Sequence, residues 1–343
     1  MAGIKRYALY LCRMKDHMFE ISATAMIMVL CWLMLVVTDV AVSGVISVCT
    51  GVTFRKAFLW GLLSLVLPPL AVAYGALWER NRFEVKDIEI TFESLPDGFD
   101  GYRIVHISDI HVRSFIGREK HLKHAADIIN SLDADLVAFT GDLISMAPDE
   151  LESTAPALRS INAKDGVVSV LGNHDYSPYI DVGEDTRKRY MEELVRTEKE
   201  MGWNLLVDSH EKICRGGDSI AVVGVQNISP SKHFHSQGDL SNALDGTDGM
   251  FRILLSHDPM LWEAEVLGKD IPLTLSGHTH AMQMSLLGWS PSSLIFRQNK
   301  GLYSRNGQYL YVNIGLGETI FPARIGARPE ITMITLRKQS KNI

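Results

Sequence analysis

Two long stretches without any charge set the N-terminal part of the chain apart from the rest. The first runs from Ile21 to Val37, 17 residues, and the second from Ala57 to Trp78, 22 residues. A helix that rises about 1.5 Å per residue needs about 20 apolar residues to cross a bilayer, with about 17 as the lower limit. We therefore predict a transmembrane helix over each run, the first extended towards Phe19.

The segment between these runs, residues 40–54, allows two interpretations. It is apolar enough for a third, short span, and it also fits a re-entrant or interfacial connector. The distribution of lysine and arginine satisfies the positive-inside rule with either two or three spans. We favour two spans, which places both ends of the pair, and the domain that follows, on the cytoplasmic side.

Beyond Arg82 the pattern changes to short β-rich runs that alternate with amphipathic helices. Residues 117–132, 184–201 and 259–267 are predicted helices, the last with Asp258 as its N-cap. The predicted strands are Arg103–Ser108, Asp135–Thr140, Val167–Leu171, Ile220–Val225, Ile253–Ser256, Leu273–Ser276 and Tyr309–Ile314. This alternation favours a layered α/β domain over residues 83–343, preceded by a membrane anchor over residues 1–82.

Charge is as unevenly distributed as hydropathy. The 343 residues carry 34 Lys+Arg and 40 Asp+Glu, a net charge of −6, of which residues 1–90 contribute +2 and the remainder −8. An acidic domain argues against nucleic acid as a partner, because a phosphate backbone requires a basic surface. Phosphoester substrates remain compatible with this charge if bound cations supply the positive field.

Five short polar motifs each follow a predicted strand. They are Ser108–His111 (SDIH), Gly141-Asp142 (GD), Gly172–Asp175 (GNHD), Ser256–Asp258 (SHD) and Gly277–His280 (GHTH). Functional loops of an open α/β sheet lie beyond the carboxyl ends of its strands. Residues i and i+2 of an extended chain face the same way, so each Asp-x-His or His-x-His pair can converge on one point. The glycines allow tight turns and a close approach to a ligand.

Each motif is weak by itself, since short Asp, Gly and His combinations are common by chance. All five in this order, each at the end of a strand, indicate a metal site. Carboxylate, amide and imidazole ligands without cysteine suit Mn²⁺, Fe or Zn²⁺. We expect His106, which lies inside the first strand, to be structural.

The ordered motifs resemble those of the calcineurin-like metallophosphoesterase superfamily, whose pattern is D-x-H, G-D, G-N-H-[DE], a single H and G-H-x-H. The similarity covers about residues 100–337. It implies a four-layer α/β fold, a β-sandwich flanked by helices, with two divalent metal ions at one edge. The ligand positions that the resemblance implies are Asp109, His111, Asp142 and His280 for the first metal, and Asp142, Asn173, His257 and His278 for the second.

The same resemblance implies a metal-dependent phosphoesterase, with Mn²⁺ as the expected metal and Fe or Zn²⁺ as alternatives. Metals about 3.5–4 Å apart lower the pKa of a shared water, so that a metal-bridged hydroxide can attack a phosphodiester or pyrophosphate bond. His174 would donate to a phosphoryl oxygen or protonate the leaving group, oriented by Asp175. The alternative is a non-catalytic membrane scaffold that retains the fold, which the complete ligand set disfavours.

Two further segments, residues 95–102 (LPDGFDGY) and 311–317 (YVNIGLG), are similar to membrane-associated bacterial members of the superfamily. That branch includes enzymes that cleave UDP-2,3-diacylglucosamine, so the resemblance implies a multi-pass protein of the bacterial inner membrane, with membrane lipids and a lipid-linked phosphoester or pyrophosphate as candidate partners. One departure is that Ala281 and Met282 replace the two glycines of the branch motif G-H-T-H-G-G-Q. Bulkier, less permissive residues there alter the local substrate contacts.

An apolar cluster follows the last motif closely. Its members are Leu286, Leu287, Trp289, Leu294, Ile295 and Phe296. The simpler interpretation, which we favour, is that they cap the core. The alternative is an apolar surface near the metals that faces the membrane and receives acyl chains.

Overall fold

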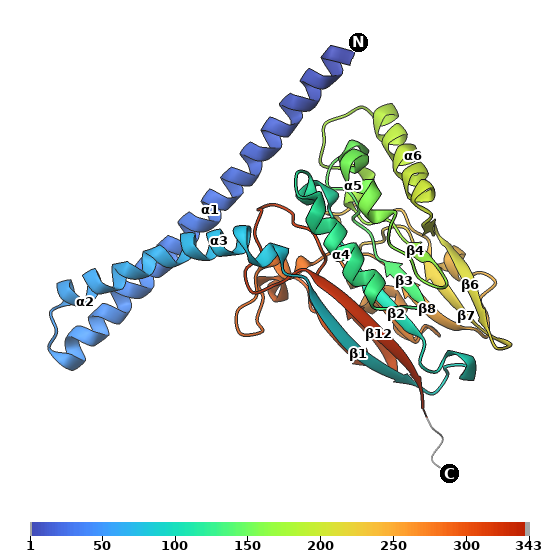
Figure 1. The fold of residues 1–343 in the computed structure, drawn as a ribbon. Coiled ribbons are helices and arrows are strands. Elements are labelled where there is room, and N and C mark those ends of the chain that lie inside the picture. Colours follow the sequence, from blue (N-terminus) through green and yellow to red (C-terminus); the bar gives the residue numbers. More distant parts are fainter. Residues whose placement is uncertain (1, 340–343) are drawn as a thin grey trace. The chain divides into compact units, whose positions relative to one another are not determined.

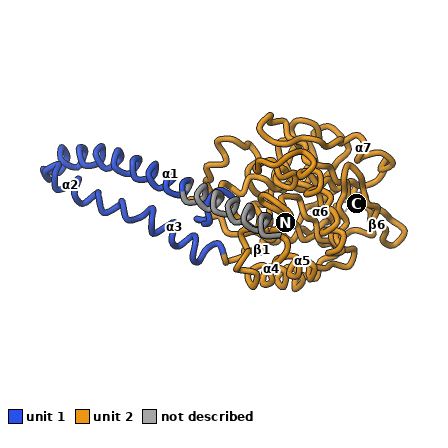
Figure 2. Tube along the Cα trace, turned by 90° about the horizontal axis from the view of Figure 1, so that it is seen from above, with its two compact units in different colours: residues 1–80, 319–325 blue, residues 81–318, 326–343 orange. Residues whose placement is uncertain are grey.

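The fold is that of a computed structural model, which describes residues 2–339. The chain divides into two compact units, residues 1–80 with 319–325, and residues 81–318 with 326–343 (Figure 2). Both predicted membrane segments belong to the first unit and all five polar motifs to the second. Each unit is described separately below.

The first unit is built from apolar helices. They are α1 (Ala2–Thr50), α2 (Phe54–Gly61), the 3₁₀ helix η1 (Leu62–Val66) and α3 (Leu67–Leu77). Over the described residues two helical segments, Thr24–Thr50 and Phe54–Asn81, are long and apolar enough to cross a membrane. Residues 40–50 continue α1, and the chain turns at Gly51, which has a φ of +73°. Residues 40–50 are therefore not a separate third span, and only residues 51–53 connect the two helices.

Helices α1 and α2 approach closely around one polar side chain. The uncharged run ends at Val37, but α1 continues, and Asp39 lies within it with its Oδ1 accepting from Ser43 Oγ at 3.1 Å. A Cβ on Gly61 would lie 1.5 Å from that Oδ1, so only glycine permits this contact. Trp32 Nε1 also donates to the carbonyl oxygen of Leu65 at 2.7 Å, which ties α1 to η1.

The second unit contains two six-stranded mixed sheets. The first has the order β1-β12-β2-β3-β4-β5, and the second has the order β10-β11-β9-β8-β7-β6. Within the first, β2, β3 and β4 are parallel, and within the second, β7, β8, β9 and β11 are parallel. The strands are β1 (Glu84–Phe92), β2 (Arg103–Ile107), β3 (Leu136–Phe139), β4 (Val167–Ser169), β5 (Asn204–Leu205), β6 (Ser209–Arg215), β7 (Asp218–Gly224), β8 (Phe251–Leu255), β9 (Leu273–Ser276), β10 (Gly301–Arg305), β11 (Gln308–Val312) and β12 (Glu330–Lys338).

Alternating side chains on the strands produce four layers. Ile104 and Val222 face the space between the sheets, whereas Val105 and Val223 face outward, as the two-residue period of a strand requires. Helices α4 (Glu119–Ser131), α5 (Leu151–Leu158) and α6 (Glu184–Met201) cover the outer face of the first sheet (Figure 1). The short helices α7 (Leu240–Leu244) and η7 (Trp262–Val266) cover that of the second. The predicted β-sandwich flanked by helices is confirmed.

Five strands were absent from the sequence prediction, namely β1, β5, β6, β10 and β12. β1 alternates apolar and charged residues, and it pairs with β12, more than two hundred residues further along the chain, with Glu84 opposite Glu330. β6 and β10 pair with β7 and β11 in hairpins, and most of the residues of both strands are exposed or half-buried. Predicted helix 184–201 has the bounds of α6, and Asp258 Oδ1 accepts from the Met260 amide at 2.8 Å, as expected of an N-cap.

A buried carboxyl group on α6 makes the stability of this unit depend on pH. Glu198 is fully buried, accepts a hydrogen bond from Ser169 Oγ, and leaves its Oε1 without a partner. Burial, reinforced by Asp175, raises the pKa of Glu198 from 4.5 to about 8. Because the folded pKa exceeds the unfolded one, the neutral carboxyl contributes fully below about pH 4.5, and that contribution is lost as the pH rises to about 8.

We therefore expect the free energy of unfolding of the wild type to fall, relative to Glu198→Gln, between pH 5 and pH 8. The amide keeps the acceptor for Ser169 and removes the ionisation, and the difference amounts to at most about 5 kcal/mol at about 1.4 kcal/mol per pKa unit. Urea unfolding of both proteins at several pH values measures it. Parallel pH profiles for the two proteins would contradict the assignment.

Candidate metal centre

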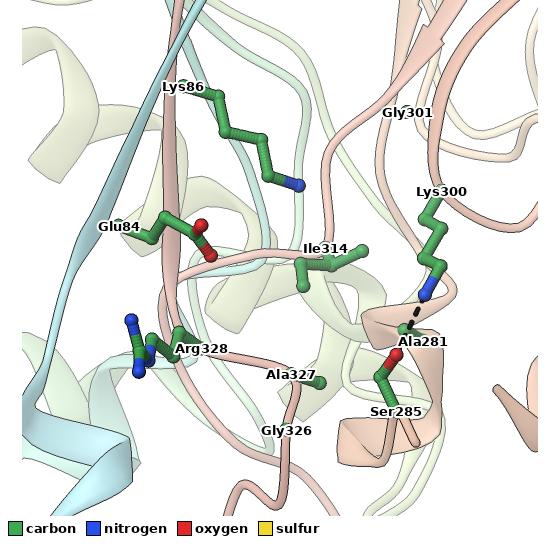
Figure 3. A pocket seen from close by; sticks show the side chains of 10 residues that line it. All are labelled: Glu84, Lys86, Ala281, Ser285, Lys300, Gly301, Ile314, Gly326, Ala327 and Arg328. Atoms are coloured by element: carbon green, nitrogen blue, oxygen red, sulfur yellow. Dashed lines mark hydrogen bonds between the residues drawn. The ribbon is translucent and has the colours of Figure 1, made fainter. Parts of the chain in front are cut away.

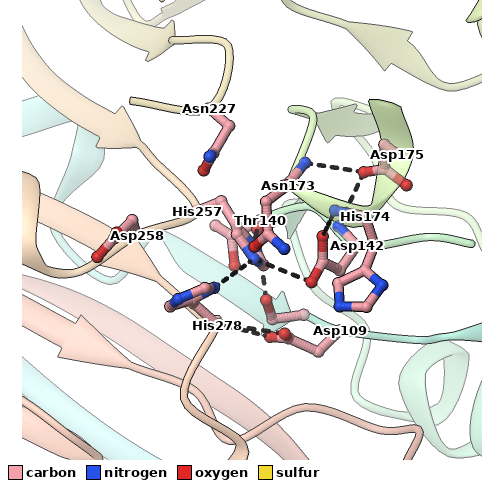
Figure 4. A network of polar contacts seen from close by, with 12 residues as sticks. Asp109, Thr140, Asp142, Asn173, His174, Asp175, Asn227, His257, Asp258 and His278 are labelled. Atoms are coloured by element: carbon pink, nitrogen blue, oxygen red, sulfur yellow. Dashed lines mark hydrogen bonds and ion pairs between the residues drawn. The ribbon is translucent and has the colours of Figure 1, made fainter. Parts of the chain in front are cut away.

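The carboxyl ends of the parallel strands of both sheets meet at one edge of the sandwich. Motifs that follow β2, β3 and β4 come from the first sheet, and those that follow β8 and β9 come from the second. The structure brings all the predicted ligands and His174 together there (Figure 4). The predicted ligands are Asp109, His111, Asp142, Asn173, His257, His278 and His280.

Several of these residues adopt a left-handed backbone conformation. Asp109, His111, Asp142, His278 and His280 have φ values between +41° and +73°. Such a conformation costs on the order of 1–2 kcal/mol for a residue with a Cβ, and it concentrates at functional sites. The backbone is therefore strained where the side chains converge.

Two glycines make the convergence of the loops possible. A Cβ on Gly277 would lie 1.8 Å from Ser108 Oγ and 2.2 Å from Asp109 Oδ2. A Cβ on Gly172 would lie 2.2 Å from Asp142 Oδ1. These glycines therefore let one loop approach another, whereas the predicted close approach to a ligand stays a prediction.

The first group of ligand atoms lies around Asp109, His111 and His280, which are all buried. His280 Nε2 lies 3.1 Å from Asp109 Oδ1 and 3.1 Å from His111 Nε2. His111 Nε2 is also 3.5 Å from Asp142 Oδ2. Asp142 therefore links this group to the second.

The second group lies around Asp142, His257 and His278. His257 Nε2 is 3.1 Å from Asp142 Oδ2 and 3.2 Å from His278 Nδ1. His257 Nδ1 donates to the carbonyl oxygen of Thr140 at 2.7 Å, which orients the ring so that Nε2 faces the group. Asn173 Oδ1 is buried here without a hydrogen-bond partner.

These residues fit divalent cations. Donor atoms around one ion with bonds of about 2.1 Å lie about 3.0–3.4 Å apart, and the facing atoms of both groups have this spacing. The orphaned Asn173 Oδ1 is an oxygen acceptor for which a cation would be the missing partner. The centre thus offers two ligand groups that share Asp142.

The pKa shifts of the ligand residues also favour a site for cations. Burial alone would raise the pKa of both carboxyl groups, yet His280 holds the pKa of Asp109 below its usual range, and His257 and His174 hold that of Asp142 well below it. Burial would lower the pKa of His257, but Asp142 outweighs it and raises that pKa to about 10. Both carboxyl groups are therefore ionised at neutral pH, and the centre attracts positive charge.

His174 lies beside the same centre, but its orientation differs from the expected one. Its Nδ1 lies 2.8 Å from the carbonyl oxygen of Ser145, and burial lowers the pKa of the ring to about 4. The Asp175 carboxylate does not contact this ring. It accepts instead from the backbone amides of Asp142, Leu143, Ile144 and Gly172. The expectation that Asp175 orients His174 is wrong, because a buried carboxylate is better satisfied by four converging amides.

Other residues of the site were not anticipated from the sequence. Tyr179 packs against the His174 ring at 4.5 Å between centroids, and its hydroxyl accepts from Asn173 Nδ2 at 2.9 Å. Phe234 lies edge-on to the His278 ring at 4.4 Å. Asn227 follows β7 at the same edge (Figure 4), and only its place after a predicted strand could have indicated it. His106 donates or accepts at Thr140 Oγ1, 2.9 Å away, inside the core, as expected of a structural histidine.

Comparison with known proteins identifies relatives over most of the chain. The model of the calcineurin-like phosphoesterase family matches residues 102–282. The chain is 31% identical over 298 residues to the uncharacterized metallophosphoesterase YkuE of Bacillus subtilis, which covers 82% of this chain and 97% of that protein. It is 33% identical over 304 residues to a transmembrane protein with metallophosphoesterase domain of Danio rerio, which covers 85% of this chain and 65% of that protein.

The chain thus spans slightly less than two thirds of the length of the Danio rerio relative. Among solved structures, the NAD nucleotidase of Haemophilus influenzae aligns at 16% identity with a TM-score of 0.41, over 63% of this chain and 45% of that one.

Tyr179→Phe should lower the affinity for Mn²⁺, used as the probe metal, by about tenfold, because removal of a side chain that orients a ligand typically has this effect. The variant removes the acceptor that fixes the Asn173 amide. Electron paramagnetic resonance of free Mn²⁺ measures the affinity of the purified full-length protein. Tyr309→Phe, on β11, is the matched control and should bind as the wild type; equal affinities in all three proteins would refute the role of Tyr179.

Proposed function

The chain belongs to the calcineurin-like phosphoesterase family and is a metal-dependent phosphoesterase, and from this premise we propose that it is a membrane-anchored enzyme with two metal ions that hydrolyses a phosphodiester or pyrophosphate bond. The observation that carries this proposal is the position of Asp142, whose carboxylate lies within 3.5 Å of both His111 and His257. A carboxylate shared by two ligand groups suits a bridging ligand.

In this proposal Asp109, His111, Asp142 and His280 hold one metal, and Asp142, Asn173, His257 and His278 hold the other. Mn²⁺ is the proposed metal, with Fe and Zn²⁺ as alternatives, because the ligand set has oxygen and nitrogen donors and no sulfur. When bound, the metals would supply the positive charge that the phosphoryl group requires and would activate water. A non-catalytic scaffold would not need this complete set.

The chain's own residues supply proton transfer and positioning. His174 Nδ1 donates to the Ser145 carbonyl, so Nε2 is the atom left to face a substrate. Because the ring is neutral at a pKa of about 4, Nε2 would first have to bind a proton, which a phosphoryl anion beside it would favour, before it donates to a phosphoryl oxygen or to the leaving group. Asp175 acts through the backbone, where it holds residues 142–144 in the turn that carries the shared carboxylate. It is a positioning residue.

For location, we propose the bacterial inner membrane, with residues 1–82 as a two-span anchor, residues 83–343 as the catalytic domain and that domain on the cytoplasmic side. The two apolar helices, their exposed side chains and the transmembrane relative support an anchor. The side rests on the choice of two spans, which places most of the flanking lysine and arginine residues on the same side as the catalytic domain.

The substrate is proposed to be lipid-linked, such as UDP-2,3-diacylglucosamine. Of the apolar cluster after the last motif, Phe296 is buried and packs against His278, but the other members are exposed. The favoured interpretation that the cluster caps the core is therefore wrong for these members, whose exposures reach 100% at Leu287. An exposed apolar surface near the metal centre suits acyl chains. The exposed members are Leu286, Leu287, Trp289, Leu294 and Ile295.

His174→Ala should lower metal-dependent hydrolysis of bis-p-nitrophenyl phosphate by about 10²-fold or more, as expected for the loss of a general acid. The assay uses full-length protein stripped of metal and restored with Mn²⁺. His124→Ala, on the solvent face of α4, is the control and should retain the wild-type rate. Hydrolysis without added metal, or an unchanged rate in His174→Ala, would rule out the mechanism.

Leu286→Ser combined with Leu287→Ser should lower kcat/KM for UDP-2,3-diacylglucosamine by about tenfold or more, since each buried leucine contributes about 1.5–3 kcal/mol. Activity on the soluble diester should not change. Mass spectrometry of released UMP measures the reaction, and Val207→Ser is the control for an exposed apolar residue elsewhere. Equal losses on both substrates, or no UMP release by the wild type, would refute a lipid-linked substrate of this kind.

A further inference from the structure

A buried glutamate outside the five polar motifs holds the loop that follows the second of them. Glu150 is the last residue of the 3₁₀ helix η5 (Pro148–Glu150), and its side chain turns back onto the residues before that helix. Its Oε2 accepts from the Ser145 amide at 2.7 Å, and its Oε1 accepts from the amides of Met146 at 2.9 Å and Ala147 at 3.4 Å. One carboxylate therefore fixes three consecutive backbone amides.

Ser145, the first of these three residues, contacts two histidines of the metal centre. Its carbonyl oxygen accepts from His174 Nδ1 at 2.8 Å, and its Oγ lies 3.3 Å from His111 Nδ1. His111 Nε2 faces His280 and Asp142, so Nδ1 is the nitrogen that is left to donate to the serine hydroxyl. A histidine that binds a metal through one ring nitrogen is oriented by the hydrogen bond of the other. A shift of Ser145 would therefore change the orientation of both rings.

Two buried carboxylates hold the whole loop between them. Asp175 accepts from the amides of residues 142–144, and Glu150 accepts from those of residues 145–147, which makes six consecutive amides. A glutamate at the third position of a helix ordinarily caps that helix through the amide of the N-cap residue. Here the shortest of the three bonds goes instead to Ser145, two residues before the N-cap. Helix capping thus leaves the contact with Ser145 unexplained.

We propose that Glu150 is a positioning residue for the hydrolytic reaction, which acts through Ser145 on the proton donor His174 and on the metal ligand His111. The inference rests on the proposed function. An amide in place of the carboxylate would keep one acceptor oxygen and turn an NH₂ group towards a backbone N–H. Glu150→Gln is therefore a small change that releases part of the loop.

Glu150→Gln should lower kcat for bis-p-nitrophenyl phosphate about tenfold and leave KM within about twofold, in full-length protein saturated with Mn²⁺. Assays at about pH 8 keep the wild-type carboxyl largely ionised, since burial raises the pKa of Glu150 to about 7. In the His174→Ala background the same substitution should change kcat by less than about twofold, because the ring through which it acts is absent. Glu198→Gln, a change at another buried glutamate, is the control and should keep the wild-type kcat.

Electron paramagnetic resonance of free Mn²⁺ tests the contact with His111 without turnover. Glu150→Gln and Ser145→Ala should each lower the affinity about tenfold, and the double variant should bind no more weakly than Ser145→Ala alone. Ser285→Ala is the matched control for the serine and should bind as the wild type. Its Oγ accepts from Lys300 Nζ at 2.8 Å in a separate pocket of about 270 Å³, whose lining includes none of the predicted ligands (Figure 3).

An unchanged kcat or an unchanged Mn²⁺ affinity in Glu150→Gln would overturn the proposal. An equal loss of kcat with and without His174 would also overturn it, because a glutamate that only stabilises the fold acts independently of that ring. If thermal unfolding shows that Glu150→Gln does not fold, a tenfold loss of affinity in Ser145→Ala supports the proposal and wild-type affinity overturns it. A wild type that hydrolyses no diester contradicts the proposed function alone, and the Mn²⁺ measurements still test Glu150.

Discussion

The need to balance buried negative charge governs the catalytic domain. Asp109 and Asp142 lie at the edge of a β-sandwich with almost no exposure, and an uncompensated buried charge of this kind costs several kcal/mol. In the protein alone, histidines provide the compensation, and His257 binds its proton more tightly as a result. Two cations would balance the same carboxylates while releasing that proton, which is why the ligand set suits metal ions so well.

That arrangement of charges requires a left-handed backbone conformation, which is unfavourable for residues with a Cβ. Five predicted ligands have positive φ, and so do Ala281 and Met282, at +49° and +47°. Glycines were expected at the last two positions by resemblance, so here the chain bears additional strain. The Ala281 side chain is buried against Ile314 and Ala327, so the surrounding packing stabilises this conformation. Asp175 contributes similarly by accepting four backbone amides beneath Asp142.

The side chains around the metal centre differ from the ligands in polarity. Aromatic rings of Tyr179 and Phe234 lie against the histidines, and exposed leucines follow the last motif. Apolar side chains therefore border a centre whose own ligands are charged or polar.

The sequence alone determined which residues meet at the candidate metal centre and which segments are apolar enough to cross a membrane, because the strand-end motifs and the uncharged runs are local patterns. It also determined the bounds of α6 and most central strands, whose apolar periodicity is strong. Only the tertiary structure decided the partners of β1 and β12, since their pairing joins segments more than two hundred residues apart. It likewise decided that Asp175 holds the backbone rather than His174, and that most of the apolar cluster is exposed. Those outcomes depend on which groups contact one another in the folded protein, and the spacing of residues along the chain does not specify these contacts.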